Sequence, residues 1–248
     1  MKLTLTLPLL AALAVSSLGA QPLSLLFGGH ADIGVEYEGG EMHLHIHTED
    51  ANIDGSVMSG DIEYEPDELA IRVPFGSTTS FTAAQAAAGV GAGESLWFLP
   101  AVDPGSNLIP FLGIGGEELA ASEWSGPITF TLGSVTSPTG SGVFSLWQVD
   151  SFGAPNFFMS SAVDSLTVNS DSTFDLPLVG EAHEHTNWGF SERGTWEIEL
   201  RASGTHNDDG AVSSGFETFT FNVVPEPAFA AVFGGLAGFV ALLRRRSV

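Results

Sequence analysis

Residues 33–47 alternate polar and apolar side chains so regularly that they fit extended β-strands and not a helix. On a strand, side chains two positions apart share a face, whereas a helix repeats its apolar positions every three or four residues. The dipeptide Gly39-Gly40 interrupts the alternation, and such a pair is typical of the tight turn between antiparallel strands. The sequence therefore predicts a β-hairpin with one face of its second strand directed at the core.

Short apolar stretches between turn-forming residues continue through the rest of the chain. We expect strands at 70–74, 95–99, 128–132, 142–149, 165–168, 195–202 and 217–224, and one candidate helix at 82–88. Many short strands with frequent turn signals are typical of a sandwich. The prediction for residues 21–224 is an all-β domain, an antiparallel β-sandwich of the immunoglobulin-like or jelly-roll type.

The charge of the chain excludes one large class of partner. Residues 21–227 contain all 30 acidic residues and three of the seven basic ones, and the whole chain has a formal charge of −23. Such a surface repels nucleic acid, which is therefore excluded as a ligand, and it attracts cations. The absence of cysteine also excludes disulfides, thiolate metal sites and cysteine nucleophiles.

The N-terminus has the features of a secretory signal peptide. Lys2 precedes an apolar run at 3–14, and small residues follow up to Ala20. The run is too short to span a membrane. We therefore predict that residues 1–20 are a signal peptide and that the protein is exported.

The C-terminus combines a motif, an apolar segment and a basic cluster. Residues 228–243 carry no charge, and Arg244, Arg245 and Arg246 follow them. Sixteen helical residues reach about 24 Å, slightly less than a hydrocarbon core, and the arginines would stay on the cytoplasmic side. We expect one C-terminal transmembrane helix that leaves the acidic domain outside the cytoplasm.

Pro225, Glu226 and Pro227 stand directly before this helix. Together, residues 225–248 resemble the PEP-CTERM sorting signal of Gram-negative bacteria. The resemblance implies an exosortase-type sorting enzyme as a partner, cleavage near the motif, and transfer from the inner membrane to the cell surface or extracellular matrix. The alternative is an ordinary C-terminal membrane anchor.

Five of the seven histidines fall in two groups in which every second residue is a histidine. Side chains two apart on a strand lie about 6.5–7 Å apart on one face, and imidazoles at that spacing can converge on one ion. Imidazole suits Zn²⁺ or another divalent transition metal. The predicted metal ligands are His43, His45, His47, His183 and His185, with His30 and Asp32, a further pair at spacing two, as additional candidates.

A second interpretation of these histidines needs no metal. The alternating side chains at 43–47 would also form the solvent-facing side of an amphipathic strand. His183 and His185 would also fix the loop before Trp188 through local hydrogen bonds. The sequence leaves both interpretations open.

A family resemblance rests on segments 29–37, 42–47, 64–67, 97–100, 115–118, 144–148, 152–153 and 183–190. They resemble the choice-of-anchor M domain, and His-Glu-His-Thr-Asn-Trp at 183–188 is similar to the actinobacterial surface-anchored protein domain. The resemblance implies a surface-displayed sandwich that binds a metal or metal complex, with a metal-uptake ABC transporter as a partner. This chain has a single His-x-His-x-Asn-Trp unit, which argues against a repeat array.

No catalytic constellation stands out in the sequence. There is no Gly-x-Ser-x-Gly elbow, phosphate loop or dinucleotide fingerprint. Adjacent carboxylates such as Glu117-Glu118 would face opposite sides of a strand. We expect a surface-anchored binding or structural protein and no enzyme. The alternatives are a ligand-free structural component of the envelope or extracellular matrix and, least favoured, a zinc-dependent hydrolase.

Overall fold

A computed structural model describes residues 22–74, 76–77, 95–162, 172–179 and 182–224. The expected signal peptide, the candidate helix at 82–88, the strand at 165–168 and the C-terminal transmembrane helix lie outside these residues. Within the described ranges, no helix has the length and apolarity that crossing a membrane requires.

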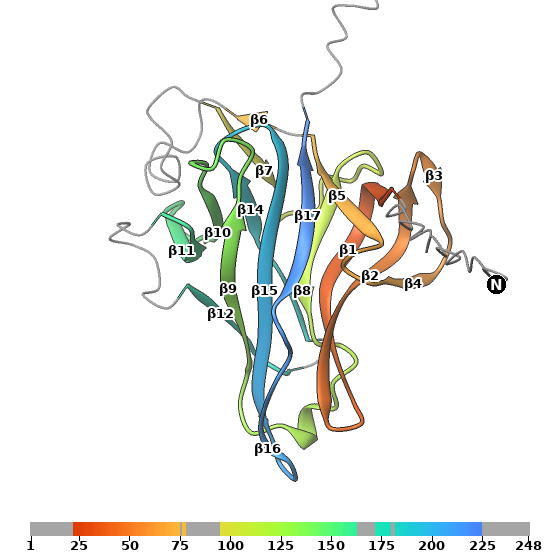
Figure 1. Ribbon diagram of the computed structural model, residues 1–248, viewed down its shortest axis with the longest axis vertical. Helices are drawn as coiled ribbons and strands as arrows, with labels where there is room; N and C mark the ends of the chain where they lie inside the picture. Colours follow the sequence, from red (N-terminus) through yellow and green to blue (C-terminus); the bar gives the residue numbers. More distant parts are fainter. Residues whose placement is uncertain (1–21, 75, 78–94, 163–171, 180–181, 225–248) are drawn as a thin grey trace, which may run out of the picture.

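The described chain forms two β-sheets and one short 3-10 helix, η1 (Ala121–Glu123) (Figure 1). The larger sheet has twelve strands, and eight of them form a continuous path: β12 (Thr173–Leu176), β9 (Ile128–Thr136), β15 (Gly194–His206), β17 (Glu217–Val223), β5 (Leu69–Val73), β1 (Ser24–Glu38), β2 (Glu41–Ile53) and β3 (Ser56–Val57). Four more strands join it: β4 (Asp61–Tyr64), β8 (Pro110–Gly115), β13 (His183–His185) and β16 (Gly210–Ser213). The smaller sheet contains β11 (Pro155–Ser160), β10 (Phe144–Val149), β14 (Asn187–Phe190), β7 (Leu96–Leu99) and β6 (Gly76–Ser77).

The domain is all-β and sandwich-like, as predicted, but the expectation of purely antiparallel sheets is wrong. Three strand pairs of the larger sheet run parallel: β1 with β5, β1 with β8, and β17 with β5. Parallel neighbours need a long crossover connection and leave no local turn signal. The sequence pattern therefore had no means of indicating them.

The predicted hairpin is confirmed as the pair β1–β2. Its register places Tyr37 opposite Met42, and the connecting Gly39 and Gly40 have φ angles of 63° and 93°. A turn with two positive φ angles matches the twist of the flanking strands, and glycine adopts it without steric cost. Met42, Leu44 and Ile46 of β2 are buried, as the pattern predicted, but His45 on the opposite face is buried as well.

Aromatic side chains fill the space between the two sheets. Trp188 from β14 stacks on Phe221 from β17, with ring centroids 5.7 Å apart. Phe190 meets Trp196 of β15 edge-on at 5.4 Å. All four rings are fully buried, so this aromatic layer holds the smaller sheet against the larger one.

Candidate metal centre

Three adjacent strands of the larger sheet, β1, β8 and β13, carry the candidate site on one face. In the register, Asp32 of β1 lies beside Gly113 of β8, and Gly113 lies beside His185 of β13. His30 is two residues before Asp32, and His183 is two residues before His185. Residues in register or two apart share a face, so the four polar side chains project to the same side.

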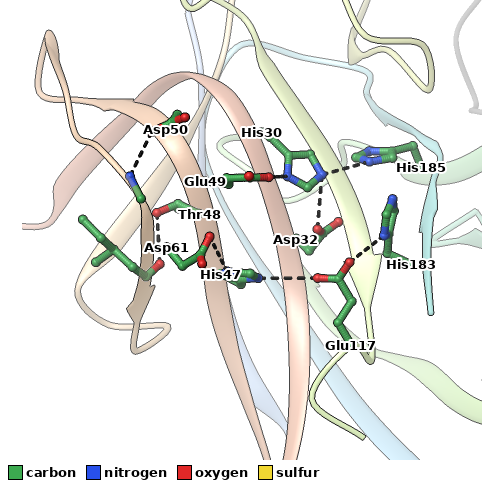
Figure 2. A network of polar contacts seen from close by, with 12 residues as sticks. His30, Asp32, His47, Thr48, Glu49, Asp50, Asp61, Glu117, His183 and His185 are labelled. Atoms are coloured by element: carbon green, nitrogen blue, oxygen red, sulfur yellow. Dashed lines mark hydrogen bonds and ion pairs between the residues drawn. The ribbon is translucent and has the colours of Figure 1, made fainter. Parts of the chain in front are cut away.

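The imidazole rings of His30, His183 and His185 lie close together on this face of β1, β8 and β13 (Figure 2). One ring nitrogen from each lies within 4.8 Å of those of the other two, and the Nε2 atoms of His30 and His185 are 3.2 Å apart. Tetrahedral bonds of 2.0–2.1 Å to one ion place ligand nitrogens about 3.3 Å apart. The observed separation therefore suits two ligands of one metal ion.

Asp32 lies beneath these rings and is almost completely buried, with 1 % of its surface exposed. Neither carboxylate oxygen has a hydrogen-bond partner among the described residues, although Nε2 of His30 is 3.4 Å from Oδ2. Burial raises the pKa of Asp32, and the nearby His30 opposes that rise. A buried carboxylate without a full partner is costly, and proteins compensate it with a paired charge or a metal.

Two glycines of β8 leave room for this arrangement. A Cβ atom at Gly113 would clash with Oδ1 of Asp32 and would lie 3.0 Å from Cε1 of His185. A Cβ atom at Gly115 would lie 3.2 Å from that of Asp32. Because β8 lacks side chains at these two positions, the groups from β1 and β13 can approach each other across it.

His185 is held as a neutral ring. It stacks on Phe111 of β8, with ring centroids 3.5 Å apart and planes inclined by 9°. Burial is the main cause that lowers the pKa of His185 to about 4, and the neighbouring His30 adds to the effect. A neutral imidazole at pH 7 keeps a lone pair for a metal.

The carboxylates of Glu117 and Glu49 contact the rings of His183 and His30 (Figure 2). Nδ1 of His183 is 2.7 Å from Glu117 Oε1, and Nδ1 of His30 is 3.7 Å from Glu49 Oε2. A carboxylate on one ring nitrogen orients the ring and makes the other nitrogen a better ligand. In both rings, the carboxylate contacts Nδ1, so Nε2 is the nitrogen that is available to a metal ion.

The structure separates the predicted ligands into three places. His30, Asp32, His183 and His185 lie together, and His47 approaches them only through Glu117, with Nδ1 3.7 Å from Oε2.

The other two predicted ligands lie elsewhere. His45 lies instead beside Glu118, and His43 is exposed and lines a pocket with Glu36. Sequence reasoning missed the roles of Glu117 and Gly113, since neither position carries a signal that can be recognised without the strand register.

Comparisons with family models, with curated proteins and with solved structures found no match for this chain.

Proposed function

We propose that this chain is an exported, surface-anchored protein whose β domain binds a divalent transition metal ion through His30, Asp32, His183 and His185. The observation that carries the proposal is the buried Asp32 carboxylate, which lacks a hydrogen-bond partner in the described chain and lies against the imidazole cluster. A cation at this position would neutralise the carboxylate and use the nitrogen lone pairs directed at it.

The donor set indicates the class of metal. Three imidazoles and one carboxylate suit Zn²⁺ or Cu²⁺, whereas Ca²⁺ and Mg²⁺ prefer oxygen ligands alone. The ligand atoms of the three imidazoles lie within 4.8 Å of one another, and Asp32, 3.4 Å from His30, would supply the fourth ligand of a tetrahedral shell, whereas a catalytic zinc site keeps one position open for water. The set of ligands therefore favours binding of the metal, or of a metal complex, over hydrolysis.

The proposed location outside the cytoplasm follows from the ends of the chain and from its charge. Residues 1–20 resemble a signal peptide, and residues 225–248 resemble a PEP-CTERM tail with a transmembrane helix. An exosortase would process this tail at the inner membrane of a Gram-negative bacterium and deliver the domain to the cell surface or matrix. A domain with so many acidic groups would collect cations there and present them to a metal-uptake ABC transporter.

Processing at both ends can be tested in cells. Mass spectrometry of the surface fraction is expected to find a polypeptide that begins near residue 21 and ends near Pro225. Replacing Pro225, Glu226 and Pro227 together by alanine should retain the protein in the inner membrane, because the sorting enzyme would lose its recognition motif. Full-length protein free in the cytosol would refute the proposed location.

Metal binding can be tested with purified protein that has been freed of metal by a chelator. We expect His185→Ala to lower the affinity for Zn²⁺ by more than about 100-fold, because loss of an outer-shell partner alone costs about 10–100-fold. Isothermal titration with a competing chelator measures the dissociation constant.

His43→Ala is the matched control for this measurement, since His43 is an exposed histidine outside the cluster, and it should leave the affinity unchanged. A wild-type protein that binds no Zn²⁺ would leave the ligand-free structural role as the better account.

A further inference from the structure

A second group of side chains of the types that ligate metals lies on the same sheet, away from the four residues of the first site. It consists of His45 on β2, Glu63 on β4 and Glu118 in the segment after β8. One ligand atom from each lies within 4.8 Å of those of the other two. Nε2 of His45 is 3.0 Å from Oε1 of Glu118.

His45 is the most constrained member of this group. Only 5 % of it is exposed, and within the described chain neither ring nitrogen makes a hydrogen bond, so Glu118 is a charged neighbour of poor hydrogen-bond geometry. The ring lies over Gly34 of β1, where a Cβ atom would clash with Nε2. Because Gly34 has no side chain, the ring of His45 from β2 fits above it, as the carboxylate of Asp32 fits above Gly113 in the first site.

The carboxylates around His45 repel one another. Glu63 and Glu118 each bring a carboxylate oxygen to within 4.8 Å of the other beside His45, and two like charges at that distance disfavour each other. A divalent cation between the carboxylates would relieve this repulsion and would give the buried imidazole a partner.

The segment that follows β8 separates the two groups. Glu117 contacts His183 and His47, whereas the adjacent Glu118 contacts His45. Backbone hydrogen bonds of 2.7 Å from Gly116 to Ala182 and of 3.0 Å from Leu119 to Gly116 hold this segment beside β13.

The strand register gives the same separation. His45 lies opposite Gly34 and His47 opposite Asp32, one step of about 6.5–7 Å along the sheet. The two groups also share no residue, and each has its own set of ligand atoms within 4.8 Å of one another.

We infer that His45, Glu63 and Glu118 form a second cation site, separate from the first and able to fill without it. Its donors are one imidazole and two carboxylates, a harder set than that of the first site. This set suits Zn²⁺ or Mn²⁺ and disfavours Cu⁺. Each polypeptide then holds two divalent ions on one face, with Glu117 holding a histidine of the first site and Glu118 acting as a ligand of the second.

The test counts bound metal. Full-length protein is stripped with a chelator, dialysed against low micromolar Zn²⁺, and its zinc content is measured by mass spectrometry. We expect two equivalents in the wild type, one in His45→Ala, one in His185→Ala and none in the double variant. Glu118→Gln, a milder change at an exposed position, should also leave one equivalent.

Two glycine variants test the same point without removing a donor. Gly34→Ala should lose only the second equivalent, and Gly113→Ala only the first, because each added methyl group displaces one ligand. Near-ultraviolet circular dichroism identifies any variant that fails to fold, and Glu118→Gln then decides.

One equivalent in the wild type that survives both His45→Ala and Glu118→Gln would overturn the second site and leave the first intact. Loss of both equivalents in either of these variants would show a single shared centre. No zinc in the wild type would refute both sites.

Discussion

Replacing Asp32 by asparagine is expected to stabilise the metal-free protein and to remove most of the stabilisation that Zn²⁺ confers. Without metal, the wild-type protein contains a buried charge that lacks a full partner, and a neutral amide at that position should raise the free energy of unfolding by about 1–3 kcal/mol. With Zn²⁺ at about 1,000 times its dissociation constant, the wild type gains about 4 kcal/mol. A variant that binds about 100-fold more weakly loses about 2.7 kcal/mol of this gain.

The free energy of unfolding of the metal-free protein should fall as pH rises through the pKa of Asp32. Burial raises the pKa of Asp32 above 3.8, so the folded state binds this proton more readily than the unfolded state does. The resulting stability is fully present below pH 3.8 and is lost as pH rises through the raised pKa. Near neutral pH the carboxylate is therefore a net cost, and Asp32→Asn should show its largest advantage there.

Thermal unfolding with chelator and with excess Zn²⁺ measures both effects. For a domain of this size, 1 kcal/mol corresponds to about 2–4 °C in the melting temperature. Asp61→Asn is the matched control, because Asp61 is 75 % exposed and lies 3.7 Å from His47. That change should stay within about 0.5 kcal/mol in both conditions. If Asp32→Asn is less stable than the wild type in chelator, the carboxylate already has a partner, and the main support for the metal site is gone.

The β1–β2 hairpin was predictable because its signals are local. The alternation assigns each side chain of β2 to a face, and a shift of register by one residue would expose Leu44 and Ile46. Gly39 and Gly40 fix the position of the turn. Both signals act within a few residues, so no knowledge of other strands was needed.

The strand β8 was not predicted, although the site depends on it. Its sequence, Pro-Phe-Leu-Gly-Ile-Gly, contains proline and two glycines, which are disfavoured in strand interiors. Gly113 and Gly115 occur there because Asp32 of another strand occupies the space above them. The reason for these glycines is a contact between strands far apart in the sequence, and a local pattern does not contain it.

The composition of the site was predicted only in part. The three histidines of β2 share a face, but they are spread along a single strand and have three different sets of neighbours. The imidazoles that lie close together instead come from β1 and β13, on either side of β8. His30 and Asp32, which the sequence offered as additional candidates, lie with His183 and His185 for this reason.

The segment His-Glu-His-Thr-Asn-Trp passes from one sheet to the other. His185 ends β13 in the larger sheet, and Asn187 begins β14 in the smaller one, with Thr186 completely buried between them. The side chain of Asn187 accepts a hydrogen bond from the backbone N–H of Ala101 and donates one to the carbonyl of Trp147, both at 3.1 Å. One short motif thus supplies two site histidines and anchors the crossing.

Trp188→Ala is expected to lower the free energy of unfolding by about 3–5 kcal/mol, the usual cost of removing a buried aromatic side chain. The indole is fully buried between the sheets against Phe221, and its Nε1 donates a hydrogen bond of 3.2 Å to the carbonyl of Leu112 in β8. Leu112 directly precedes Gly113, the first residue of β8 that pairs with β13. The variant would lose both the packing and this link between the crossing and β8. Urea unfolding followed by circular dichroism measures the loss.

Two further variants distinguish the loss of packing from the loss of the hydrogen bond to Leu112. Trp97→Ala removes a partly buried tryptophan that contacts Arg193, and it should cost only about 1–2 kcal/mol. Trp188→Phe keeps most of the packing but removes the hydrogen bond from the indole to the Leu112 carbonyl, and it should cost about 1–3 kcal/mol. Because Leu112 adjoins Gly113, this variant should also weaken Zn²⁺ binding at the first site, whereas Trp97→Ala should not. Equal losses of stability for the two alanine variants would show that the sheets are not held together at Trp188.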